Sequence, residues 1–181
     1  MSLSQGERSL GPSDGEIRIK TGREGVAAKV GHDLTIRFDK WSGQLRVGPG
    51  GPADASVEVE IQLPSFVVVS GVGGAKALSD GDKADITKNG LKHIDADKYP
   101  VATFRSTAAK PSGNGGVLEG TFTLAGKSVP LALTVTDGGG GKWHATGEIT
   151  QTGLGLKQFK AMMGALKLAD AIVIEIDLNL A

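Results

Sequence analysis

Strict alternation of apolar and polar residues is the sequence feature that most constrains the fold of this chain. The segment Ser56–Leu63 reads SVEVEIQL, and the segment Ile172–Leu180 reads IVIEIDLNL. Every second side chain of an extended strand lies on the same face, so each segment predicts a β-strand with one apolar face. Residues 131–136 alternate in the same way.

Short strands separated by turns account for most of the remaining chain. Weaker strand patterns occupy Glu16–Thr21, Val26–Phe38, Trp41–Val47, Phe66–Ser70, Val101–Thr107, Gly116–Leu124 and Lys142–Thr150. The 28 Gly and 7 Pro residues are spread along the chain and mark turn sequences such as Gly48–Pro52 and Pro111–Gly116. Frequent glycine turns between strands of one-sided polarity favour an antiparallel barrel or sandwich.

Two segments carry helical patterns. Residues 79–94 have Ser79 or Asp80 as a candidate N-cap, and residues 156–168 space large apolar side chains at helical intervals. Both helices are short, so we expect an all-β fold with one or two short helices. The polar residues 1–14 predict a flexible N-terminal arm, and residues 15–181 predict a single domain.

The charge balance excludes several classes of partner. The chain has 20 Lys and Arg against 20 Asp and Glu, a formal net charge of zero. A nucleic-acid binder with a broad basic face or a polybasic membrane anchor would carry an excess of basic residues.

The sequence contains no apolar run long enough for a transmembrane helix. No secretory signal is visible, so we expect a cytoplasmic location, or a periplasmic or secreted one if an export signal has been removed.

The sequence offers no convincing catalytic or metal motif. Cysteine is absent, and no Gly-x-Ser-x-Gly occurs. Gly126-Lys127-Ser128 resembles the end of a phosphate-binding loop, but the spacing and the following strand pattern favour a hairpin turn. Gly71–Gly74 resembles a dinucleotide turn, but it lacks the third glycine and is interpreted as a flexible loop. We therefore expect no enzymatic activity, no cofactor and no metal.

The most distinctive stretch of the chain is residues 94–107, which read IDADKYPVATFRST. The expected first helix precedes it, and LEGTFTLAGKSVPL follows at residues 118–131. Nearer the N-terminus, Val30–Leu34 reads VGHDL, and Trp41–Leu45 reads WSGQL. In this order the segments resemble the YceI-like family over roughly residues 16–180. The resemblance implies an extended lipocalin-like antiparallel β-barrel of about eight strands, associated with polyisoprenoid lipids.

The resemblance implies non-catalytic binding of a long apolar ligand inside the barrel, by a carrier or sequestering protein. The barrel of such a protein would be incompletely filled, which is consistent with only eight aromatic residues in this chain. The candidate ligand-binding residues are Val30, His32, Phe38, Trp41, Ile61, Phe66, Phe104, Phe122, Leu133, Phe159 and Met162. The expected partner is an isoprenoid or another lipid-like molecule, with no nucleic acid and no transmembrane segment.

Two other functions stay open at this point. The barrel could be fully packed and serve as an interaction or scaffold protein, for example as a homodimer. Alternatively, His32, His93 and nearby carboxylates could form the site of a hydrolase or metal enzyme. A cavity in the folded protein would discriminate against the first alternative, and bound metal or activity lost in histidine variants would support the second.

Overall fold

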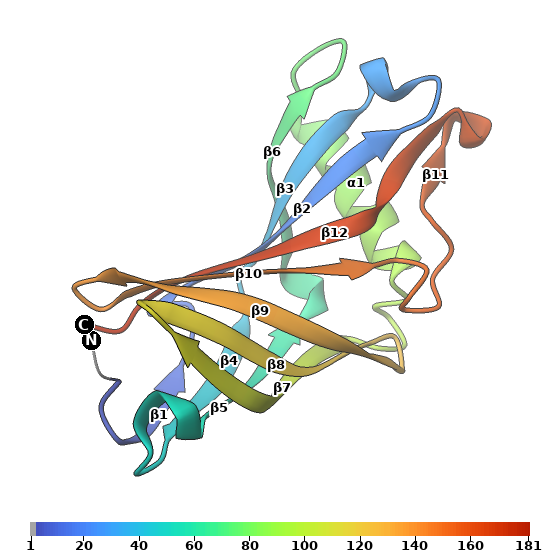
Figure 1. Cartoon of the computed structure of the whole chain (residues 1–181). Helices are drawn as coiled ribbons and strands as arrows, with labels where there is room; N and C mark the ends of the chain where they lie inside the picture. The colour runs from blue at the N-terminus through green and yellow to red at the C-terminus, as the bar shows by residue number, and fades with distance from the viewer. Residues whose placement is uncertain (1–2) are drawn as a thin grey trace.

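The alternating segments assemble into one long antiparallel β-sheet that curls around its own concave face (Figure 1). The computed structural model describes residues 3–181. The strands are β1 (Gly6–Leu10), β2 (Gly15–Glu24), β3 (His32–Phe38), β4 (Trp41–Val47), β5 (Ala55–Gln62), β6 (Phe66–Gly73), β7 (Val101–Ser112), β8 (Gly115–Leu124), β9 (Lys127–Gly139), β10 (Lys142–Thr150), β11 (Lys160–Ala161) and β12 (Leu166–Asn179). The helices are α1 (Asp80–His93) and the short 3-10 helices Ala28–Val30, Gly51–Asp54, Leu63–Ser65 and Met162–Gly164.

The sheet is a half-barrel of more strands than the sequence predicts. Eleven strands follow the order β1-β4-β5-β7-β8-β9-β10-β12-β2-β3-β6, and the short β11 pairs with β12. Among the strand pairings within residues 3–181, none joins β1 to β6, so these two strands form the edges of the curled sheet. The expectation of about eight strands, which the family resemblance implies, is wrong: the ten strand patterns of the sequence all lie in this sheet, β1 adds an eleventh, and β11 pairs at its side.

The strongest strand predictions are confirmed by the pairing of the sheet. β5 covers most of the alternating segment at residues 56–63, and it pairs with β4 and β7. β12 extends six residues further toward the N-terminus than the predicted segment at residues 172–180. The apolar positions of these strands lie in a single hydrophobic core on the concave face. Phe38 and Phe66, from the paired strands β3 and β6, meet edge to face with ring centroids 5.9 Å apart.

The N-terminal segment is more ordered than a flexible arm. Residues 6–10 form β1, which pairs along its whole length with β4, from Gly6 opposite Val47 to Leu10 opposite Gly43. Leu10 is buried in the core, and this burial stabilises the strand although its sequence is polar overall. Residues 1 and 2 lie outside the described part of the chain.

One predicted helix is confirmed and the other is wrong. α1 begins after Ser79, whose side chain accepts a hydrogen bond from the Asp82 amide while the Asp82 carboxylate accepts one from the Ser79 amide. Residues 156–168 instead form β11, a 3-10 turn and the start of β12. Met162 and Met163 have φ angles of 51° and 55°, and the start of β12 pairs with β2 and β11. Pairing with a neighbouring strand therefore overrides the helical spacing.

One glycine motif is the hairpin turn that the sequence predicts, whereas the flexible loop predicted at Gly71–Gly74 is wrong, because residues 71–73 pair with β3. Ala125 and Gly126, with φ angles of 50° and 74°, form the two-residue turn between β8 and β9. Two successive positive φ angles are typical of a type I′ hairpin, so the Gly126-Lys127-Ser128 stretch is no phosphate-binding loop. The Gly71–Gly74 stretch ends β6, which is antiparallel to β3.

Candidate functional site

A cavity of about 870 Å³ lies between the concave face of the sheet and α1. Its walls follow the strand alternation. On β5, for example, Val57, Val59 and Ile61 line the cavity while the intervening Glu58 and Glu60 are exposed. The apolar faces of the strands therefore form a surface that the protein's own side chains do not fill. This volume lies within the usual range of sites for small molecules and cofactors.

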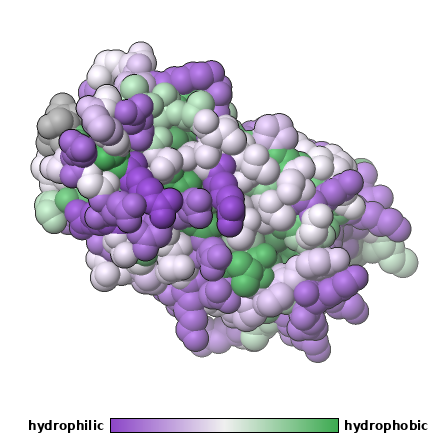
Figure 2. Space-filling model, turned by 90° about the horizontal axis from the view of Figure 1, so that it is seen from below, coloured by the Kyte–Doolittle hydropathy of each residue, from purple (hydrophilic) through white to green (hydrophobic). Residues whose placement is uncertain are grey.

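Hydrophobic residues reach the surface on one face of the molecule. Seen from below, hydrophobic surface lies between hydrophilic side chains along the middle of this face (Figure 2). The residues of α1 that line the cavity include Ile86, Gly90 and Ile94 just beyond its end. A Cβ atom at Gly90 would lie 2.9 Å from the ring of Phe66, so glycine allows the helix to approach β6 closely.

The structure brings ten of the eleven predicted ligand-binding residues to this cavity. They are Val30, His32, Phe38, Trp41, Ile61, Phe66, Phe104, Phe122, Leu133 and Phe159. Met162 is the exception: its side chain is 58% exposed and lies outside the lining. It was selected from the helical spacing of residues 156–168, and the tight turn that replaces this helix directs it toward solvent.

Gln151 is a buried polar residue in the wall that the sequence analysis missed. Its side chain is embedded after β10, where the amide nitrogen Nε2 donates to the Ala169 carbonyl at 2.9 Å. Its oxygen Oε1 accepts from the Phe159 amide at 3.0 Å and lies 2.9 Å from Nε2 of His93. Because Oε1 can only accept, His93 donates from Nε2. The sequence indicates this role of Gln151 only weakly, as a polar residue at the junction of a strand and a loop.

His93 and His32 are held by the protein itself. The His93 ring also packs edge to face on Phe159, with centroids 5.3 Å apart. Nε2 of His32 lies 2.7 Å from the Lys76 carbonyl, so this nitrogen carries a proton as well. Within residues 3–181, no three His, Asp or Glu side chains converge in the manner of a metal site. The two histidines are therefore structural links between the sheet, α1 and the loop after β6.

Asp170 fixes the loop that carries Gln151. Its carboxylate accepts hydrogen bonds from the hydroxyl and the amide of Thr152. These bonds stabilise the charged form, which lowers the pKa of Asp170 below its ordinary value. The bonds from Ser79 lower the pKa of Asp82 in the same way at the start of α1. The loop after β10 and the start of α1, which both border the cavity, are thus each stabilised by an ionised carboxylate.

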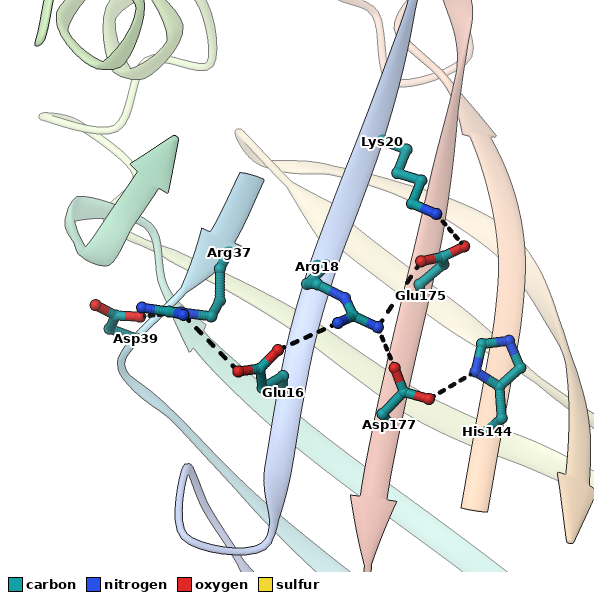
Figure 3. Close-up of polar contacts among 8 residues, drawn as sticks. All are labelled: Glu16, Arg18, Lys20, Arg37, Asp39, His144, Glu175 and Asp177. Carbon is teal, nitrogen blue, oxygen red and sulfur yellow. Dashed lines mark hydrogen bonds and ion pairs between the residues drawn. The ribbon is translucent and has the colours of Figure 1, made fainter. Parts of the chain in front are cut away.

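A network of charged side chains lies on the outer face of β2, β3, β10 and β12 (Figure 3). Arg18 is its centre and contacts Glu16, Glu175 and Asp177. Lys20, Arg37, Asp39 and His144 extend it through further ion pairs. Asp39 raises the pKa of Arg37 through a hydrogen bond and its charge. These groups are partly exposed and paired with one another, so they link neighbouring strands and do not contribute to the cavity.

Within residues 3–181, no helix is both long and apolar enough to cross a lipid bilayer.

Comparison with known proteins agrees with this architecture. The chain is 31% identical over 170 residues to a UPF0312 protein of Vibrio cholerae serotype O1, covering 87% of this chain and 83% of the relative. A UPF0312 protein of Shewanella sp. strain ANA-3 is 30% identical over 135 residues, covering 70% and 61% of the two chains.

Solved structures share the fold. The crystal structure of Burkholderia cenocepacia BcnA superposes with a TM-score of 0.60 at 22% identity, covering 90% of this chain and 94% of the other. The YceI protein of Campylobacter jejuni superposes with a TM-score of 0.59 at 18% identity, covering 79% and 81%. The model of the YceI-like domain matches residues 14–180. The chain therefore belongs to the YceI-like family.

Proposed function

We propose that the protein binds one long apolar molecule of the isoprenoid type in its cavity and carries or sequesters it without changing it chemically. The observation that supports this proposal is a cavity of about 870 Å³ whose surface is mostly apolar, formed by the curled sheet and closed in part by α1. A fully packed scaffold would have no such space.

The size of the cavity suits a long chain. At about 30 Å³ for each small group in a liquid, the cavity has room for roughly 30 non-hydrogen atoms. Thirty carbons correspond to six isoprene units. Each buried CH₂ contributes about 0.8 kcal/mol, so one unit of five carbons contributes roughly 4 kcal/mol before the chain is ordered. Ordering a flexible chain offsets part of this gain, yet several units leave a favourable balance without a polar contact.

The absence of a chemical step in the proposal rests on how Gln151 and the two histidines of the wall are used. Gln151, His93 and His32 all have partners within the protein. A general acid or base has to reach the reacting atoms of a bound molecule. Groups already bonded to the protein stabilise the wall instead.

Native mass spectrometry after incubation with prenols of increasing length tests the proposal. We expect a one-to-one adduct, and organic extraction should return the prenol with its mass unchanged. An arginine inside the cavity, in Phe104→Arg or Phe122→Arg, should abolish the adduct because it brings a charge into an apolar site. Thr121→Arg is the matched control, since Thr121 precedes Phe122 on β8 and is exposed.

Three results would overturn the proposal. Folded wild-type protein that forms no adduct with any prenol would refute isoprenoid binding. An adduct that persists in both folded cavity variants would place the ligand elsewhere. A recovered molecule of altered mass would contradict non-catalytic binding.

A further inference from the structure

Exposed apolar side chains gather at one end of the molecule. Six large hydrophobic residues among residues 3–181 have at least two fifths of their surface exposed, and they lie in three segments of the chain. They are Val26, Val30, Val69, Val72, Met162 and Met163. The most exposed are Val26 at 96% and Met163 at 107% of a fully exposed reference. Single exposed apolar residues are ordinary, but a group at one end of a fold marks an interaction surface.

Four of these residues lie on two connections that contact each other. Val26 and Val30 belong to the β2–β3 connection, and Met162 and Met163 to the β11–β12 turn. The Ala27 amide donates to the Ala165 carbonyl at 2.9 Å and joins the two connections. Both reach the same end of the molecule in Figure 1. We call Val26, Val30, Met162 and Met163 the apolar tip.

Basic residues outnumber acidic residues on the two connections that form the apolar tip. Residues 22–33 and 157–168 contain five basic and two acidic residues, a net charge of +3 in a chain whose total is zero. Arg23 pairs with Asp33. By contrast, none of the ion pairs within residues 3–181 includes Lys29, Lys157 or Lys160.

The pairing of β11 with β12 adds to this local excess. Lys160 is directly opposite Lys167, and like charges at opposed positions of a sheet repel each other. Glu24 lies on the other side of Lys167, but its carboxylate accepts a hydrogen bond from Gln158. An anionic surface would relieve the repulsion, so the charge of this end is complementary to anionic groups.

The apolar tip borders the mouth of the cavity. Val30 is both 45% exposed and part of the cavity lining, followed in the lining by Gly31 and His32. Ala161 and Leu166, which flank the exposed methionines, also line the cavity. A molecule that leaves the cavity at this end passes directly between the two connections of the tip.

We propose that the apolar tip inserts into the surface of a lipid bilayer that contains anionic lipids, with Lys29, Lys157 and Lys160 against the headgroups. Apolar side chains bordered by lysines are typical of segments that bind in the interfacial region. Docking in this orientation lets an apolar molecule pass between the bilayer and the cavity without crossing water. The passage of an apolar molecule rests on the function proposed above, whereas docking itself does not.

Flotation with vesicles tests the docking. Ligand-free protein should bind vesicles of phosphatidylcholine mixed with phosphatidylglycerol better than phosphatidylcholine alone, and less as salt concentration rises. Lys29→Ala with Lys160→Ala should weaken binding roughly 30-fold. Lys40→Ala with Lys142→Ala is the matched control, because these exposed lysines lie outside the tip and the charge change is the same.

Insertion of the methionines has its own test. Met162→Ser with Met163→Ser should weaken vesicle binding at least about tenfold. A Met163→Trp variant should show emission shifted to the blue and quenched by brominated lipid, beyond the signal of the native Trp41 and Trp143. Unchanged emission, or equal binding by the tip variants and the control, would overturn the proposal. So would a dimer in solution that the methionine variants dissociate, since the tip would then cover a second copy.

Ligand binding without vesicles separates the two proposals. The Met162→Ser, Met163→Ser protein should bind prenols in solution as the wild type does, because neither side chain lines the cavity. Vesicle binding by a protein that takes up no prenol would leave docking in place and refute the cavity function. Prenol binding without any vesicle binding would leave the cavity function in place and refute docking.

Discussion

Replacing Ala145 with phenylalanine should shorten the ligand that the cavity accepts. Ala145 lies on β10 opposite Val135 of β9 and Ile176 of β12, and all three line the cavity. The change adds a phenyl ring of six carbons to the wall without removing any existing contact. At about 30 Å³ for each group, the ring occupies roughly 180 Å³, about a fifth of the 870 Å³.

The lost volume corresponds to about one isoprene unit. Binding should therefore strengthen with prenol length up to about six units in the wild type, and reach its plateau one unit earlier in Ala145→Phe. For the longest prenol, excluding one unit removes up to about 4 kcal/mol, an upper limit of roughly a thousandfold in Kd. A ligand that bends or partly protrudes would reduce the loss, so we expect a weakening of about 10-fold or more.

Competition with a fluorescent apolar probe across the prenol series measures both plateaus. Ala132→Phe is the matched control, because Ala132 lies on β9 between the lining residues Leu131 and Leu133 and is exposed. The same ring is then added to the opposite face of the sheet. An unshifted plateau in folded Ala145→Phe would refute the reasoning, as would an equal shift in the control.

Three further predictions concern stability. Ala125→Gly should stabilise the fold by about 1 kcal/mol, seen as a higher urea midpoint, because alanine is unfavourable at a φ of 50° in the β8–β9 turn. Gln151→Leu should destabilise by about 3 kcal/mol in the same assay, since it leaves the partly buried Phe159 amide and Ala169 carbonyl without a hydrogen-bond partner. Asp170→Asn should cost stability near neutral pH, and the difference from the wild type should shrink as pH falls through the pKa of folded Asp170. The sign follows because that pKa is lowered on folding, so the stabilisation is complete above the ordinary carboxylate pKa; a difference independent of pH down to strong acid would contradict it.

The sequence predicts this fold best where side-chain alternation and burial agree. β5 and β12 alternate strictly, and each buries its apolar face. β1 reads GERSL and shows no alternation, because its position depends on the main-chain bonds of β4. Residues 156–168 show the opposite problem, since their apolar spacing fits a helix while β2 provides the partner for a strand. The pattern of a single segment does not reveal the distant strand with which that segment pairs.

The residues of the candidate site were likewise predictable only where strand alternation sets which side chains face inward. Inward-facing aromatic and aliphatic residues could be selected because the wall of the cavity is the apolar face of each strand. Gln151 could not, because its role depends on a hydrogen bond from His93 of α1, 58 residues away, and on a loop that brings the Phe159 amide back to it. Met162 was misassigned together with the helix that carried it. Homodimer formation and the cellular location stay predictions.

The pairing of the polar wall groups with the protein has a consequence for specificity. Oε1 of Gln151 accepts two hydrogen bonds, and Nε2 of His32 is bonded to a carbonyl, so these atoms have little capacity left for a ligand. A site that rejects analogues by leaving its buried polar groups unpaired would need such capacity. Next to Gln151 and His32, discrimination must therefore come from length and cross-section, where each added or missing methylene changes binding by only about 1–3 kcal/mol. A family of apolar chains of similar length should accordingly compete for it, with the plateau set by the space between the strands and α1.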